Sequence, residues 1–219
     1  MAGKISVKGT GRLSLSPDQT DILLTLNSRD KDYPTAAGIA ESRIESLKTA
    51  LLPLGFSPED LRTSGFSVRA EYEGVQDEKG IFRNVFSGYC CTHQLRLTFP
   101  MDNQKLSEVI SAVSSSGAEP ELSITFGIGD PESAKEELLR SAAENARKKA
   151  SILAAASGAS LGKLLEIRYS VSEKDFVSPA AVEMNDCLRA CGSGLAKAVS
   201  FQPEDISVSD SAEFVWELE

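Results

Sequence analysis

A period of two in the apolar residues recurs along this chain of 219 residues and constrains its fold more than any other feature. Alternation of apolar and polar residues is typical of strands that are buried on one face. The pattern predicts about seven strands, which lie within residues 5–15, 22–26, 66–73, 85–99, 122–128, 165–171 and 206–218.

In three other segments the apolar residues are spaced by three or four, which predicts amphipathic helices at 35–54, 106–117 and 131–157. Pro34 and Pro131 suit the first turn of a helix, and Gly55 suits its end. A doubly wound parallel sheet needs strict alternation of strands and helices, and this order fails twice here. The predicted class is therefore α+β, with antiparallel sheets built from hairpins and three main helices.

The first predicted strand carries Gly9 and Gly11 on its apolar face, which indicates a bulge or the close approach of another backbone. Residues 16–19, Ser-Pro-Asp-Gln, have the composition of a turn, and the alternation resumes at Ile22. We therefore expect the chain to open with a hairpin. The many alanines of the helix at 131–157 permit close packing, either within the fold or between subunits.

Residues 173–203 lose the periodicity, and we interpret them as a variable segment inserted in a single domain that spans 1–219. Within this segment, apolar residues from Pro179 to Ala190 are spaced as in a short amphipathic helix. The segment is either a surface lid or an element that sets assembly or partner choice. The similar stretches at 55–61 and 201–206 are compatible with two related helix–strand units or with a chance match.

The charge balance excludes one class of function. The chain has 23 basic and 32 acidic residues and a net charge of -9, so it lacks the cationic surface that binds nucleic acid. No stretch approaches the roughly 18 apolar residues of a membrane-spanning helix. The N-terminus lacks a signal-peptide core, which predicts a cytoplasmic location for the chain as written, or an exported one if a leader has been removed.

Catalytic options are few because His93 is the only histidine. It shares a strand face with Cys91, so a Cys–His contact is one interpretation and packing in the strand is the other. Cys90 and Cys91 point to opposite faces and cannot chelate one metal together. Cys187 and Cys191, spaced as i and i+4, supply only half of a structural zinc site. Reduced thiols are expected for all four cysteines.

Two short motifs resemble functional signatures but lie in the wrong context. Residues 158–162 match G-x-S-x-G, yet they follow a helix and precede a strand, so we interpret them as a helix end and a turn. Residues 126–130 resemble a phosphate-binding loop but lack its third glycine and its lysine, and Asp130 occupies the phosphate position. The sequence thus predicts no catalytic, cofactor-binding or metal-binding residue.

The order of several motifs resembles the SIMPL-domain (YggE-like) family. They are Ile-x-Val-x-Gly-x-Gly at 5–11, Pro17-Asp18, Leu-Gly-Phe at 54–56, Asp-Leu-Arg-Thr at 60–63, Gly88-Tyr89, Gly117-Ala118, Asn-Ala-Arg-Lys-Lys-Ala at 145–150 and the turn at 158–162. The resemblance implies an α+β fold without established catalytic residues. It also implies export in many members, assembly into large rings or channel-like oligomers, links to stress tolerance in some members and an adaptor role in an animal member.

These observations predict a non-enzymatic protein of the SIMPL type that self-assembles or acts as an adaptor, with a role that could be stress-related. Edge strands and the alanine-rich helix also favour a homo-oligomer, and a protein partner is compatible with them. Two alternatives stay open from the sequence. One is a thiol-dependent redox protein that uses Cys91 with His93, or Cys187 with Cys191, and the other is a small-ligand carrier.

Overall fold

A computed structural model describes residues 3–76, 82–170, 175–184 and 201–219. It confirms the α+β class. The elements along the chain are β1 (Gly3–Leu15), β2 (Gln19–Asp30), α1 (Tyr33–Leu51), the 3-10 helix η1 (Leu52–Leu54), β3 (Arg62–Gln76), β4 (Phe82–Pro100), α2 (Asn103–Ser115), β5 (Glu121–Gly127), α3 (Pro131–Ala156), β6 (Leu161–Arg168), β7 (Val177–Met184) and β8 (Ile206–Leu218).

The chain divides into two compact units. Unit 1 comprises Met1–Asp18, Gly127–Pro179 and Pro203–Glu219, and unit 2 comprises Gln19–Phe126 and Ala180–Gln202. Unit 1 contains helix α3 and a three-stranded sheet of order β1-β8-β6. Unit 2 contains helices α1 and α2 and most of a five-stranded sheet of order β3-β4-β2-β5-β7.

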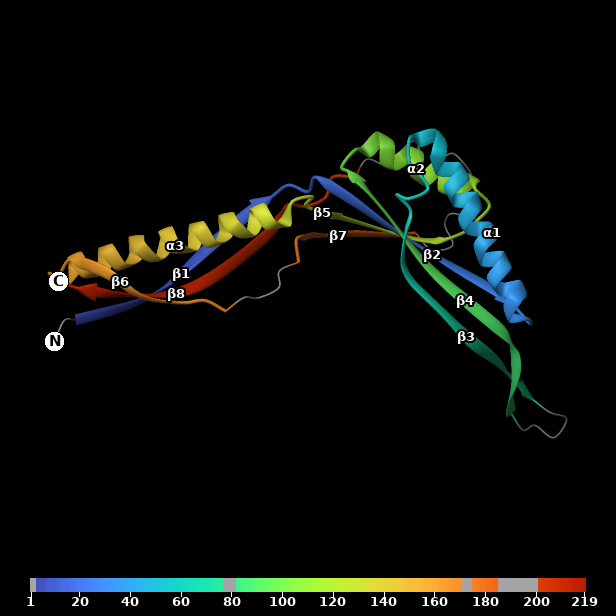
Figure 1. Cartoon of the computed structure of the whole chain (residues 1–219), viewed down its shortest axis with the longest axis horizontal. Coiled ribbons are helices and arrows are strands. Elements are labelled where there is room, and N and C mark those ends of the chain that lie inside the picture. Colours follow the sequence, from blue (N-terminus) through green and yellow to red (C-terminus); the bar gives the residue numbers. More distant parts are fainter. Residues whose placement is uncertain (1–2, 77–81, 171–174, 185–200) are drawn as a thin grey trace. The chain divides into compact units, whose positions relative to one another are not determined.

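In unit 1, helix α3 lies along β1 and β8 (Figure 1). A Cβ atom on Gly9 would overlap the carbonyl oxygen of Ala142, and one on Gly11 would overlap that of Leu138. The close backbone approach predicted from the two glycines is therefore confirmed, and α3 is the element that approaches. The helix face against the sheet consists of small or fully buried residues, namely Ala134, Leu138, Ala142, Ala146, Ala150 and Ala154.

The core of unit 1 is narrow because alanines face the sheet. Phe214 and Trp216 of β8 stack with ring centroids 5.6 Å apart and pack with Val7 and Ala146. This pair supplies the large rings of the cluster under this part of α3. At the other end of α3, Leu138 packs with Ala134 and Phe176.

In unit 2, alternate residues of three strands face the helices, as the period of two predicted. The buried set on the strands is Ile22, Leu24 and Leu26 of β2, Leu95, Leu97 and Phe99 of β4, and Leu122, Ile124 and Phe126 of β5. Helices α1 and α2 cover these residues with Leu47, Leu51, Leu106, Val109, Ile110 and Val113. The opposite face is polar, where Asn27 accepts a hydrogen bond from Thr92 (2.8 Å) and donates one to Glu121 (3.0 Å).

The opening hairpin is a wrong prediction. β1 pairs with β8 along its whole length, from Gly3 opposite Leu218 to Leu15 opposite Ile206, whereas β2 pairs with β4. The segment between β1 and β2 does not close a hairpin because its polar groups bond elsewhere. The Asp18 N–H donates to the Gly127 carbonyl, and the Asp18 carboxylate accepts from the Gly129 N–H.

The helix predicted from Pro179 to Ala190 is also wrong over its described part, because residues 177–184 form strand β7. Phe176 and Ser178 are buried and alternate with exposed neighbours, so a period of two prevails over the helical spacing. Pro179 is tolerated because β7 is a terminal strand of its sheet. The rest of that prediction, at 185–190, lies outside the described residues.

Two boundaries also differ from the sequence prediction. The connection between the strands predicted at 66–73 and 85–99 is shorter than expected, since β3 continues to Gln76 and β4 begins at Phe82. The strand expected at 165–171 begins earlier, at Leu161, and ends at Arg168. The first difference matters most, because it extends the β3–β4 hairpin at its far end.

Candidate functional site

His93 and Cys91 do not form a catalytic pair in this structure. His93 Nε2 lies 2.9 Å from the Thr63 hydroxyl, and its ring packs edge-on against Phe66 at 5.3 Å. Partial burial lowers the pKa of His93, so the neutral ring is favoured. Cys91 instead packs with Ala36, Ala40 and Val68 under α1. The geometry supports packing for both side chains.

The adjacent thiols are buried on opposite faces of β4. Cys91 is 0% exposed, and burial, with a smaller effect of Cys90, raises the pKa of its thiol. A raised pKa reduces the thiolate fraction, and the thiolate is the reactive form of cysteine. Cys187 and Cys191 lie outside the described residues, so this geometry bears only on the pair in β4.

We expect iodoacetamide to alkylate Cys90 and Cys91 at least about tenfold more slowly in the folded protein than in urea, because reaction requires local opening. The rates are measured by mass spectrometry of the peptide that contains β4 after timed exposure at neutral pH. The urea-unfolded chain is the control. Faster reaction of Cys91 in the folded chain than of a free thiol would contradict the prediction and support the redox alternative.

The two signature-like motifs have the structural roles expected of them. Helix α3 ends at Ala156, and Gly158 adopts a left-handed φ of 74° that closes the helix. Ser160 then pairs with Glu219 through backbone hydrogen bonds, and its hydroxyl donates to the Glu219 carbonyl at 3.2 Å, which is a structural contact. At the start of α3, the Asp130 carboxylate accepts from the Ser133 N–H at 3.0 Å and thus occupies the place where a phosphate would bind.

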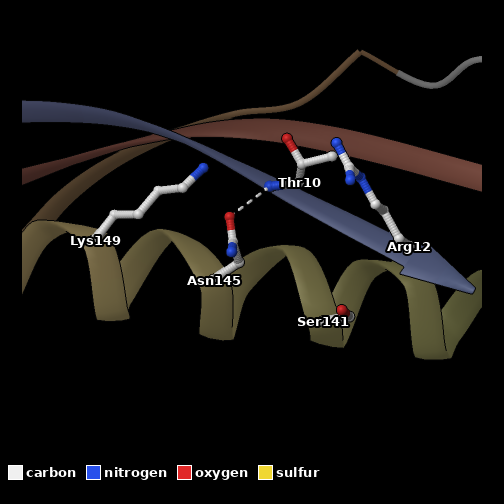
Figure 2. A pocket seen from close by; sticks show the side chains of 5 residues that line it. All are labelled: Thr10, Arg12, Ser141, Asn145 and Lys149. Carbon is white, nitrogen blue, oxygen red and sulfur yellow. Dashed lines mark hydrogen bonds between the residues drawn. The ribbon is translucent and has the colours of Figure 1, made fainter.

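A polar groove of about 430 Å³ lies between α3 and β1 (Figure 2) and is lined by Thr10, Arg12, Ser141, Asn145 and Lys149. Asn145 Oδ1 accepts from the Thr10 N–H at 3.1 Å, and Lys149 Nζ donates to the Lys8 carbonyl at 3.1 Å. Because β1 is a terminal strand, these bonds satisfy backbone groups that a further strand would otherwise use. The groove therefore closes one sheet edge, and its polar lining differs from the apolar pocket expected of a small-ligand carrier.

The far end of the β3–β4 hairpin displays large apolar side chains to solvent. We call this part the extension and define it as Tyr72–Gln76 of β3 and Phe82–Phe86 of β4. β2 ends at Asp30, opposite Tyr89, so the extension is a two-stranded ribbon that continues past the start of α1 (Figure 1). Its large apolar residues are 45% to 73% exposed, and they are Tyr72, Val75, Phe82, Val85 and Phe86.

Aromatic rings connect the extension to the covered part of the sheet. Tyr72 packs edge-on against Phe86 at 5.9 Å, Phe86 against Tyr89 at 5.2 Å, and Tyr89 against Tyr33 of α1 at 6.1 Å. These four residues form the aromatic row. It continues the apolar face that α1 covers elsewhere, but at Tyr72 and Phe86 no described element lies over it. This exposed surface is the strongest candidate site in the part of the chain that the structure describes.

The sequence analysis missed this site although a signal was present. Apolar residues occur in both parities at the ends of the two strands, as Tyr72 with Val75 and as Val85 with Phe86. A half-buried strand has apolar residues of one parity only. Apolar residues on both faces of a two-stranded ribbon therefore indicate surface that needs a further partner.

Comparison with known proteins gives the family. The model of a family named SIMPL, described as a protein of unknown function (DUF541), matches residues 5–216. The chain belongs to the SIMPL family. Within this SIMPL chain, the match includes both units and the whole β3–β4 hairpin.

Named relatives of the SIMPL chain are similar over most of its length. Uncharacterized protein YggE of Edwardsiella ictaluri is 23% identical over 98% of this chain and 86% of its own. YggE of Escherichia coli K12 is 23% identical over 98% of this chain and 83% of its own. A 26 kDa periplasmic immunogenic protein of Brucella melitensis is 23% identical over 75% of this chain and 65% of its own.

A comparison with solved structures adds no argument about the SIMPL chain. The regulatory subunit of aspartate kinase from Thermus flavus shares 14% identity over 88% of this chain and 99% of its own, with a TM-score of 0.18. Separately, no described helix is long and apolar enough to cross a membrane.

Proposed function

We propose that this SIMPL protein is a non-enzymatic, self-assembling protein and that copies of it associate through the β3–β4 extension. The observation that carries the proposal is the exposed aromatic surface of the extension. Tyr72, Phe82 and Phe86 are 62%, 73% and 45% exposed. Since an aromatic side chain buries roughly 150–250 Å², together these three side chains expose on the order of 350 Å².

The free-energy balance of the extension favours a partner. A two-stranded ribbon is marginal in water without a third strand or a packed face. An exposed apolar patch of this size is often functional, and aromatic residues are enriched among those that dominate the binding energy of interfaces. A second copy presents the same surface, so closed symmetric association buries both extensions at once.

The non-enzymatic part of the proposal rests on the structural contacts that the candidate catalytic residues make. His93 bonds Thr63, Cys91 is enclosed under α1, and Asp130 caps its own helix. The adaptor and stress-related roles stay predictions from the family resemblance. The printed name of the Brucella relative places that protein in the periplasm, which agrees with the exported alternative for this chain.

The proposal is tested by static light scattering of the full chain from micromolar to millimolar concentration. We expect particles at a multiple of 23.4 kDa. The triple variant Tyr72→Ser/Phe82→Ser/Phe86→Ser is expected to raise the dissociation constant at least about 100-fold, since each lost aromatic anchor costs more than about 1 kcal/mol.

The matched control is Ile152→Ser/Leu153→Ser, which removes exposed apolar side chains from α3 instead. We expect this variant to retain the wild-type mass. Circular dichroism checks that all variants are folded. Particles of about 23 kDa at every concentration would contradict the proposal, as would an unchanged mass of the triple variant.

A further inference from the structure

The four terminal strands of the two sheets differ in how well they can accept another strand. β1 is closed by Asn145 and Lys149. β6 is short, carries Lys163 and pairs with β8 through two register shifts. β7 is short and contains Pro179. Each of these features discourages the addition of a strand at that edge.

β3 is the least protected of the four, since its only inserted residue, Ser64, lies near its start. It is a terminal strand of 15 residues and contains neither lysine nor proline. Its register shift near Tyr72 arises in β4, where Ser87 is the extra residue, so β3 itself is continuous from Gly65 to Gln76. β4 is the only described strand that pairs with it. A long, regular edge of this kind is a template for another strand.

We propose that β3 pairs antiparallel with β3 of a second copy across a two-fold axis at Ala70, which joins the two five-stranded sheets. This inference rests on the proposed self-assembly and specifies the part of its interface that β3 forms. In an antiparallel pair, outward-facing backbone groups belong to every second residue. When a strand pairs with its own copy, these residues must lie opposite one another, so the two positions of each pair are both odd or both even. The two-fold axis therefore passes beside one residue, which lies opposite its own copy.

Charge selects the residue at the axis. An axis at Ala70 sets Arg69 opposite Glu71 of the second copy, and symmetry repeats this pair. Arg69 makes no ion pair within the described chain, whereas Glu71 binds Arg29 at 3.0 Å. Arg29 and Arg69 both lie opposite Cys90 of β4, so their side chains are on one face of the sheet. Glu71 would then lie between the guanidinium group of Arg29 in its own chain and that of Arg69 in the second copy.

Two-fold axes at the neighbouring residues place less favourable charges opposite each other. An axis at Arg69, Glu71 or Glu73 places that charged residue opposite itself, since it lies on the axis. An axis at Tyr72 places Glu71 opposite Glu73, and an axis at Val68 pairs no opposite charges. Like charges directly opposite each other destabilise an antiparallel pair, and opposite charges stabilise it. Among axes from 68 to 73, only Ala70 pairs opposite charges without pairing like ones.

The apolar residues agree with the same axis. Tyr72 would lie opposite Val68, and Phe66 opposite Gly74, so each exposed ring covers a smaller residue of the second copy. Aromatic and β-branched pairs are favourable across strands, and an aromatic ring opposite glycine compensates for the missing side chain. Tyr72 and Phe66 are 62% and 54% exposed in the single chain. Pairing would run from Gly65 to Val75, nearly the whole continuous part of β3.

Charge substitution tests the register. Arg69→Glu alone and Glu71→Arg alone each create two like-charge pairs, and we expect each to raise the dissociation constant at least about tenfold. In an equimolar mixture of the two variants, every pair across the interface becomes opposite in charge, while the Arg29–Glu71 pair stays lost in one copy. The dissociation constant of the mixture should therefore be at least about tenfold lower than that of either variant alone. Arg147→Glu on the exposed face of α3 is the control and should leave the mass unchanged. Failure of the mixture to recover overturns the register.

Cross-linking tests the axis. In a Cys187→Ser/Cys191→Ser background, Ala70→Cys should form a covalent dimer with itself on mild oxidation. Glu73→Cys should not, because its two copies would lie about 20 Å apart at roughly 3.3 Å per residue. A mixture of Ser67→Cys and Glu73→Cys should cross-link as a heterodimer.

The outcomes separate the two proposals. If light scattering shows oligomers but Ala70→Cys does not cross-link, the axis is wrong and self-assembly stands. If Glu73→Cys cross-links with itself while Ala70→Cys does not, the register is wrong. If the wild-type chain is monomeric throughout, both proposals are overturned.

Discussion

Replacing Gly9 with alanine is expected to destabilise unit 1 by about 3 kcal/mol or more. The added methyl group would overlap the Ala142 carbonyl oxygen and also approach the Ala146 Cβ to 2.7 Å. The obstacle is helix backbone, so no side-chain rotation relieves it and α3 must move away from β1. That movement separates the helix from Phe214 and Trp216, which are the large rings of the cluster that contains Ala146.

Trp216 is the only tryptophan, so its fluorescence during urea unfolding reports on unit 1. The control is Gly38→Ala in α1, where an added Cβ meets nothing within 4 Å. This control should be neutral or stabilising by about 0.5–1 kcal/mol, because alanine is favoured over glycine in a helix. Ala146→Gly should not rescue Gly9→Ala, since the Ala142 carbonyl remains in place. An unchanged midpoint for Gly9→Ala would show that α3 does not approach β1 this closely.

Truncating Leu24 to alanine is expected to destabilise unit 2 by about 2–5 kcal/mol. Leu24 is fully buried in the central strand β2, and it belongs to the cluster that α1 and α2 cover. Because the neighbouring side chains come from strands and helices on several sides, the cavity cannot collapse fully, which adds to the lost transfer free energy.

Native-state hydrogen exchange of peptides from β2 and β4 measures this change within unit 2. Leu52→Ala is the matched control, because the same atoms are removed from a side chain that is 50% exposed. The control should change the opening free energy by less than about 0.5 kcal/mol. Equal effects of the two substitutions would contradict the assignment of Leu24 to the core.

Local patterns in the sequence were sufficient to predict most of the helices and strands. The period of two located the strands, and the spacing of three or four located the helices, because each reflects which side chains a regular backbone turns to one face. Capping residues, proline and glycine marked the ends of helices, as Asp130 and Pro131 do at the start of α3. Gly9 and Gly11 even indicated a close backbone approach, since a missing side chain on an apolar face leaves room for one.

The candidate site was less accessible to these patterns. Tyr72 alternates as a core residue does, and only the apolar residues of both parities nearby distinguish the extension from a covered strand. Exposure depends on where β2 and α1 begin and end beside β4, which is a property of several segments together. The choice between packing and chemistry for His93 likewise depended on Thr63, which lies on a different strand.

Residue order alone thus specified the α+β class, the helices and the strand faces, all of which follow from interactions within a few residues. The tertiary structure decided that β1 pairs with β8 instead of β2, that residues 177–184 extend a sheet, and that the β3 edge is open. These features depend on pairing between segments far apart in the chain. The free energy of such pairing comes from backbone hydrogen bonds and side-chain fit across strands, and no local periodicity encodes which strand will be the neighbour.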